Sequence, residues 1–114
     1  MADASIRLLV LSWVFTTLLL VLLIASIAAG RGALRLNHLF GVRLPALMVN
    51  EAAWRRGHAA AVLPAAIAFG VAIVASLVGL VAPVTYWLAI AAFVAGVIGV
   101  FVRANSAARA VHAS

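Results

Sequence analysis

The sequence predicts an all-α integral membrane protein with three transmembrane helices and an arginine-rich loop between the first and the second. Of the 114 residues, 68 % are apolar and 9 % are charged, and the mean hydropathy is +1.30, far outside the range of soluble domains. Leu8–Ala29 contains no ionisable side chain, and Ala59–Val102 contains only Tyr86. Between these stretches, residues 31–58 hold five of the eight arginines.

The arginine-rich stretch cannot lie inside a bilayer. An arginine at mid-membrane depth costs about 2.5–3.5 kcal/mol, so five would cost more than about 10 kcal/mol. Residues 31–58 are therefore predicted to form a structured surface loop. The length of the chain suits a single membrane domain over residues 1–114.

The first predicted span is residues 8–29, about 33 Å long as a helix and enough to cross a hydrocarbon core of roughly 30 Å. Ser26-Ile27-Ala28 has the small-x-small pattern of a signal-peptide cleavage site, which leaves a cleaved signal as an alternative. The apolar run is longer than a signal peptide needs, and Arg7 is offset by Asp3. These features favour a span.

The second apolar stretch is too long for one crossing. Gly79 followed by Pro83 predicts a break, because glycine ends helices and proline prevents their continuation. The predicted spans are therefore residues 59–80 and 84–102. Tyr86 and Trp87, just after the break, are expected at the membrane–water interface.

Three spans place the two termini on opposite sides of the membrane. The loop and the C-terminal tail share one side, and together they hold seven arginines: Arg31, Arg35, Arg43, Arg55, Arg56, Arg103 and Arg109. The positive-inside rule makes this side cytoplasmic. The absence of lysine, with abundant Ala, Val, Arg and Gly, is consistent with a high-GC bacterial genome. We expect a multi-pass protein of a bacterial plasma membrane, with its N-terminus outside and the 31–58 loop and C-terminus cytoplasmic.

The net charge of +6 indicates a membrane partner rather than nucleic acid. The arginines lie beside predicted spans, where the anionic headgroups of the lipid bilayer attract them by roughly 1 kcal/mol each. The chain has no cysteine, which excludes disulfides and cysteine metal sites.

Small residues recur at four-residue spacing in the second and third spans, where they let helices approach closely. In the third span they are Ala91, Ala95 and Gly99 on one stripe and Ala92 and Gly96 on the next. In the second span they are Ala68, Ala72 and Ser76, and separately Ala66 and Gly70. Two compatible uses follow: packing of the two spans as an internal hairpin, and association with a membrane protein partner or a second copy.

The first part of the loop contains a predicted bend. Gly41 permits a turn with positive φ, and Pro45 restricts Leu44 to extended conformations. Gly41–Pro45 is therefore expected to present Arg43. Whether residues 31–50 form a helix or an irregular loop is left open by the sequence.

The second part of the loop is predicted to begin a helix. Asn50 suits an N-cap, and Glu51 complements the helix dipole. Glu51, Trp54 and His58 then share one face, with Glu51 as the counter-ion of Arg43 or Arg55. Pro64 is expected to kink the helix, which separates a short interfacial helix, about residues 51–60 and anchored by Trp54, from the second span. Alternatively, the span begins near Ala59 with Pro64 in its first turns.

Glu51, His38 and His58 form only a weak candidate for a metal or acid–base site, because one carboxylate and two histidines match no ligand motif. Neither a metal nor another cofactor is expected. The spans contain no acid, lysine or histidine, which argues against a proton-coupled transporter.

The loop resembles the signature of the SdpI-like (Sdp immunity protein) family of small bacterial membrane proteins. The family pattern runs Asn, a gap, Gly-Ile-Arg-Thr-Pro, then a serine or acid, Trp, and His or Gln one turn later. It is matched here by Asn37, Gly41, Arg43, Pro45, Trp54 and His58. Leu44 stands where the family often has threonine, so a hydroxyl that could bind the loop backbone or a ligand is missing. The resemblance covers residues 37–58, and the three-span layout agrees with it.

The resemblance implies protection or signalling rather than catalysis. The protein after which the family is named is longer, with extra membrane helices; it protects its producer from a secreted membrane-active toxin and relays a signal to a transcriptional repressor. We therefore expect a non-enzymatic inner-membrane protein that acts through protein or lipid contacts, with Arg43 as the recognition group, oriented by Glu51. The alternative is a small accessory subunit of a larger membrane complex. A homo-oligomeric pore or carrier is disfavoured because no span has a polar stripe.

Overall fold

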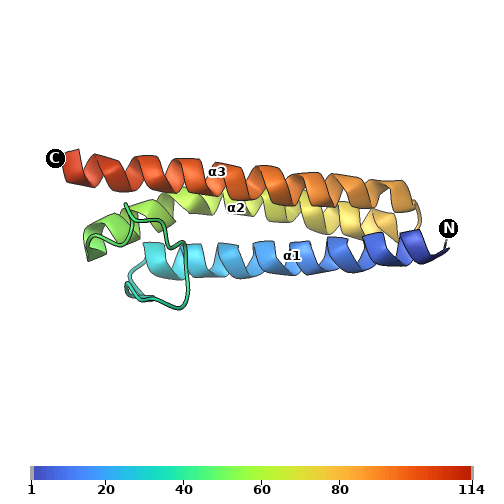
Figure 1. Ribbon diagram of the computed structural model, residues 1–114, viewed down its shortest axis with the longest axis horizontal. Helices are drawn as coiled ribbons and strands as arrows, with labels where there is room; N and C mark the ends of the chain where they lie inside the picture. The colour runs from blue at the N-terminus through green and yellow to red at the C-terminus, as the bar shows by residue number, and fades with distance from the viewer. Residues whose placement is uncertain (1, 114) are drawn as a thin grey trace.

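The computed structural model describes residues 2–113 and the side chains of residues 4–112. Three long helices, α1 (Ala2–Gly30), α2 (Glu51–Gly79) and α3 (Tyr86–Ala113), lie side by side in a bundle of 54 × 21 × 19 Å (Figure 1). A short 3-10 helix, η1 (Pro83–Thr85), precedes α3, and residues 2–113 contain no strand. All three long helices are long and apolar enough to cross a membrane, which confirms the predicted all-α fold with three spans.

The connections place the loop and the C-terminus together. Figure 1 shows the 31–50 connection and the C-terminal end of α3 at one end of the bundle, with the N-terminus at the other. The helices extend beyond the predicted apolar spans; α3, for example, continues through Arg103 and Arg109, which are both exposed.

Helix α2 begins where the sequence predicts. Asn50 is the N-cap, with φ −159° and ψ 175°, and its Oδ1 accepts a hydrogen bond from Ala53 N–H at 2.8 Å. The prediction of a separate interfacial helix is wrong, because α2 is continuous from Glu51 to Gly79 with Pro64 inside it. Figure 1 shows the first turns of α2 at an angle to the rest, as expected where a proline removes one hydrogen bond but neighbouring helices hold both halves.

The turn between α2 and α3 depends on a glycine. The ring of Tyr86 lies against Gly79 so closely that a Cβ there would collide with it, and the Tyr86 side chain is buried. Thr85 Oγ1 donates to the carbonyls of Ala75 and Ala82, each at 3.0 Å. Of the two residues expected at the membrane–water interface, Trp87 is 60 % exposed, whereas Tyr86 packs inside the bundle.

The core is built on small residues of α2. Ala61, Ala65, Ala68, Ala72 and Ala75 are buried at heptad-like spacing, and α2 packs against both α1 and α3. This confirms the predicted hairpin of the second and third spans. Between α1 and α3, the rings of Phe15 and Phe93 stack with centroids 4.3 Å apart and planes at 11°.

Three buried hydroxyls join α1 to α2 near the other end of the bundle. Ser12 Oγ and Ser76 Oγ share a hydrogen bond, Thr16 Oγ1 lies 3.0 Å from Ser76 Oγ, and Thr16 also donates to the Ser12 carbonyl at 2.7 Å. Because each hydroxyl has a partner, the cluster satisfies its polar atoms within the apolar bundle. It aligns the two helices without any ionisable group.

Candidate functional site

The loop, residues 31–50, consists of turns and bends rather than a helix. It starts where α1 ends: Gly32 has φ +83°, and the amides of Arg31 and Ala33 close the last turn on the carbonyls of Ile27 and Ala28. Side chains of the loop itself and of the first two turns of α2 then bind its backbone at several points. These contacts define the site.

Asn37 closes a turn at the tip of the loop. Its Oδ1 accepts hydrogen bonds from Leu39 N–H at 2.8 Å and Phe40 N–H at 2.7 Å, and its Nδ2 donates to the Arg35 carbonyl at 2.7 Å. One side chain therefore satisfies three backbone groups of an irregular segment. The role of this signature residue is to shape the tip.

Gly41 and His58 form a tightly packed part of the site. Gly41 has φ +99°, as predicted, and a Cβ there would lie 2.8 Å from His58 Nε2 and 2.8 Å from Trp54 Cη2. Beside it, Val42 N–H donates to His58 Nε2 at 2.8 Å, while His58 Nδ1 lies 2.7 Å from the Trp54 carbonyl. The pattern corresponds to a neutral imidazole with its proton on Nδ1.

Trp54 belongs to the interior rather than to the membrane interface. Its side chain is fully buried, its indole N–H donates to the Leu34 carbonyl at 2.9 Å, and its ring lies 4.2 Å from that of His58. The sequence expectation that Trp54 anchors an interfacial helix is therefore corrected. The indole is instead the surface on which the loop folds.

Glu51 binds backbone rather than arginine. Its Oε1 accepts a hydrogen bond from Leu36 N–H at 3.0 Å. Among the side chains of residues 4–112, it forms no ion pair with Arg43 or Arg55, so the predicted counter-ion role is wrong. Helical spacing in the sequence predicts Arg55 as the partner of Glu51. In the folded loop the Leu36 amide binds the carboxylate instead.

Leu47 and Gly57 are site residues that the sequence interpretation missed. Leu47 is fully buried, and a Cβ on Gly57 would lie 2.5 Å from its Cδ2. The signal was present as a glycine in the interior of a predicted helix, where it costs about 1 kcal/mol and usually has a packing reason. Pro45 opens the turn that carries Leu47, with Met48 N–H donating to its carbonyl at 3.1 Å.

Arg43 is turned outward. It is exposed, while its neighbour Val42 is buried and bound to His58. Arg31, Arg35, Arg55 and Arg56 are exposed too. His38 is exposed whereas His58 is buried, and the described residues contain no group of three or more His, Cys, Asp or Glu side chains that could hold a metal ion.

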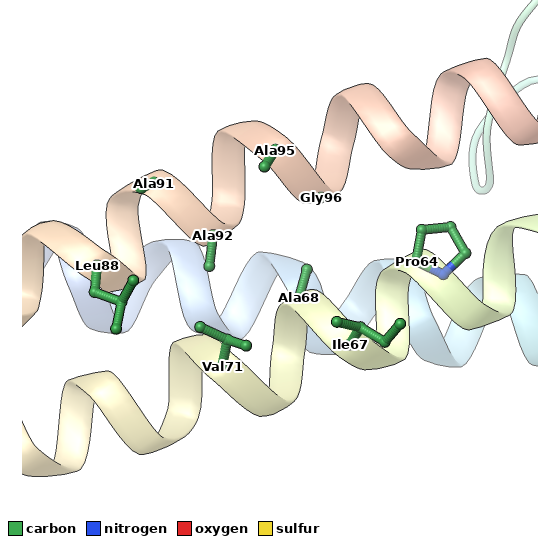
Figure 2. A pocket seen from close by; sticks show the side chains of 9 residues that line it. All are labelled: Pro64, Ile67, Ala68, Val71, Leu88, Ala91, Ala92, Ala95 and Gly96. Carbon is green, nitrogen blue, oxygen red and sulfur yellow. The ribbon is translucent and has the colours of Figure 1, made fainter.

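The five predicted packing residues of α3 differ in exposure, and all but Gly99 line one groove. Gly96 is buried against Ala68, where a Cβ would collide, and Ala92 and Gly99 are half-buried. Ala91 and Ala95 are exposed and line an apolar groove of about 440 Å³ between α2 and α3, which Figure 2 shows from close by. Pro64, Ile67 and Val71 form the α2 side of this groove.

Comparison with known proteins gives one match. The model of the SdpI/YfhL protein family matches residues 33–103, which include residues 33–50 of the loop, all of α2 and most of α3. No curated protein and no solved structure matches the chain.

Proposed function

Because the chain belongs to the SdpI/YfhL protein family, we propose that this multi-pass membrane protein acts without catalysis, in protection against a membrane-active toxin or in membrane signalling. It acts through protein or lipid contacts of the loop, with Arg43 as the recognition group. The positive-inside rule, applied to the seven arginines at the loop end, puts this loop in the cytoplasm.

One contrast carries the proposal. The side chains of Asn37, Glu51, Trp54 and His58 each form at least one hydrogen bond to the loop backbone, and Gly41 provides the space for this arrangement. These contacts fix the backbone next to Arg43, because His58 binds the amide of the preceding residue, Val42. The Arg43 side chain itself is exposed. A rigid backbone lowers the conformational entropy that a recognition residue loses on binding.

The test compares Arg43→Ala with Arg56→Ala in bacteria that depend on this chain for survival under a membrane-active peptide. Both arginines are exposed at the same end of the bundle, so the two variants remove the same charge. We expect Arg43→Ala to lose protection at unchanged protein level and thermal stability, and Arg56→Ala to retain it. Equal survival of both variants would refute recognition by Arg43.

A second candidate, an accessory subunit of a larger membrane complex, is favoured by the groove between α2 and α3. Small residues such as Ala91, Ala95 and Gly96 line this groove, so the backbone of a partner helix could approach closely. Native mass spectrometry of the protein, gently extracted from its own membrane, tests this candidate. Co-purification of defined membrane proteins that Ala95→Leu abolishes supports the subunit role, and a monomer or small homo-oligomer without partners supports the first proposal.

A further inference from the structure

A second groove lies between the outer face of α1 and the loop. It has a volume of about 370 Å³ and is lined on the α1 side by Val21, Ile24, Ala25 and Ala28, and on the loop side by Ala33, Leu34 and Phe40. All seven side chains are apolar, and Phe40 remains 63 % exposed. The tip of the loop is therefore folded back along the last turns of a membrane-spanning helix.

Side chains of the protein bind three backbone amides of the tip, which lowers the cost of holding this segment against the membrane surface. Irregular backbone is costly in hydrocarbon unless its polar groups have partners. Here the amides of Leu39 and Phe40 donate to Asn37 Oδ1, and the amide of Val42 donates to His58 Nε2. Leu39, 80 % exposed beside Phe40, places a further apolar side chain at the surface of the tip.

Three arginines lie close to residues that line this groove, two of them in the chain and one in space. Arg31 and Arg35 are exposed and flank the lining residues Ala33 and Leu34 in the chain. Arg55 joins them from α2: its Nε lies 3.4 Å from the position of a Cβ on Gly32. The nearby acid, Glu51, accepts a hydrogen bond from the Leu36 amide, and among residues 4–112 it forms no ion pair with these arginines.

We propose that this groove binds one acyl chain of an anionic phospholipid, whose phosphate is held by Arg31, Arg35 and Arg55. The apolar lining fits the acyl chain, and the positive charge of the three neighbouring arginines fits the phosphate. The proposal is independent of the recognition role of Arg43, since it uses other residues.

Two other occupants fit less well. A second copy of the chain seated in this groove would bring two sets of arginines together, which is unfavourable without counter-ions. Inorganic phosphate would match the arginines but leave the apolar groove unfilled. An anionic phospholipid satisfies both parts at once.

Tryptophan quenching tests the site directly. The Trp54 indole binds the carbonyl of the groove residue Leu34, and replacing the other two tryptophans (Trp13→Phe, Trp87→Phe) makes it the only indole in the chain. This protein is reconstituted with phosphatidylcholine and titrated with phosphatidylglycerol brominated on its acyl chains, or with brominated phosphatidylcholine. We expect quenching at a lower mole fraction of phosphatidylglycerol. The test uses the single variant Arg31→Gln and the double variant Arg31→Gln/Arg35→Gln. Each arginine removed should raise the mole fraction of phosphatidylglycerol at half-maximal quenching about fivefold.

Matched variants distinguish binding of phosphatidylglycerol in this groove from general attraction of the anionic lipid to exposed arginines. Arg7→Gln removes an exposed arginine at the opposite end of α1 and should change nothing. Ala25→Phe fills this groove and should reduce quenching, whereas Ala91→Phe, in the groove between α2 and α3, should not. Equal quenching by the two lipids, displacement by inorganic phosphate, or no effect of Ala25→Phe would overturn the proposal. Circular dichroism measures the helicity of each variant. If the double variant does not fold, the fivefold effect expected for Arg31→Gln alone tests the proposal.

Discussion

His58 Nε2 accepts a hydrogen bond from the Val42 amide at 2.8 Å, and this contact ties the loop to helix α2. Both groups are buried, so water cannot replace either partner. The bond lies next to Gly41 and Arg43, between the turn that needs a glycine and the arginine that is exposed. A signature histidine therefore serves the loop as an acceptor for its backbone.

We predict that His58→Ala lowers the free energy of unfolding by about 1–3 kcal/mol, because it leaves a buried amide without its partner. Thermal unfolding in detergent measures the loss, and hydrogen exchange should show faster exchange at the Val42 amide. His38→Ala, at an exposed position, is the control and should leave both quantities unchanged. Equal effects of the two variants would exclude the buried bond as the cause.

Gly41→Ala should destabilise the protein by more than about 1 kcal/mol. The residue has φ +99°, and a Cβ would meet His58 and Trp54 at 2.8 Å. Gly70→Ala is the matched control, since a Cβ at that helical position meets no atom within 4 Å. Chemical denaturation of both variants in detergent gives the comparison, and a loss at Gly70 as large as that at Gly41 would contradict the argument.

Glu51→Gln and Glu51→Ala distinguish a backbone contact from an ion pair. Glutamine keeps an oxygen that can accept from the Leu36 amide, whereas alanine removes it. We expect Glu51→Ala to cost about 0.5–1.5 kcal/mol of stability, since the bond is exposed to solvent, and Glu51→Gln clearly less. If the two variants lose the same stability, the charge of Glu51 matters more than its hydrogen bond.

Ser76→Ala should weaken the contact between α1 and α2. It removes the hydroxyl that bonds to both Ser12 and Thr16, and hydrogen bonds between membrane helices contribute about 0.6–1.7 kcal/mol. Ser26→Ala is the control, because the buried Ser26 hydroxyl has no hydrogen-bond partner in the described structure. Unfolding of both proteins in mixed micelles should show destabilisation at Ser76 and none at Ser26.

Gly96→Ala should destabilise the bundle more than Gly99→Ala. A Cβ on Gly96 collides with the Ala68 side chain of α2, whereas one on Gly99 meets Pro64 Cβ at an ordinary 3.4 Å. Overpacking of this kind costs about 1–3 kcal/mol. The melting temperatures of the two variants test this prediction. Equal values would mean that α3 can move away from α2 without loss of stability.

Local features of the sequence predict much of the fold. Uncharged stretches of span length predict the helices, Asn50 predicts the start of α2, and Gly41 predicts a positive φ. Each depends on one residue or one short segment, so it can be derived without knowledge of the contacts across the bundle. The continuity of α2 through Pro64 could not be derived in this way, because packing on both sides offsets the lost hydrogen bond.

The sequence by itself determined the three apolar helices, the arginine-rich connection and the residues of the family signature. Only the tertiary structure decided which atoms those residues bind: Glu51 the Leu36 amide, Trp54 the Leu34 carbonyl and His58 the Val42 amide. It also turned Gly96 inward and Ala95 outward. The physical reason is that lipid is as apolar as the helix interior, so hydrophobic periodicity cannot indicate the inward face, and contacts over long sequence separations settle it.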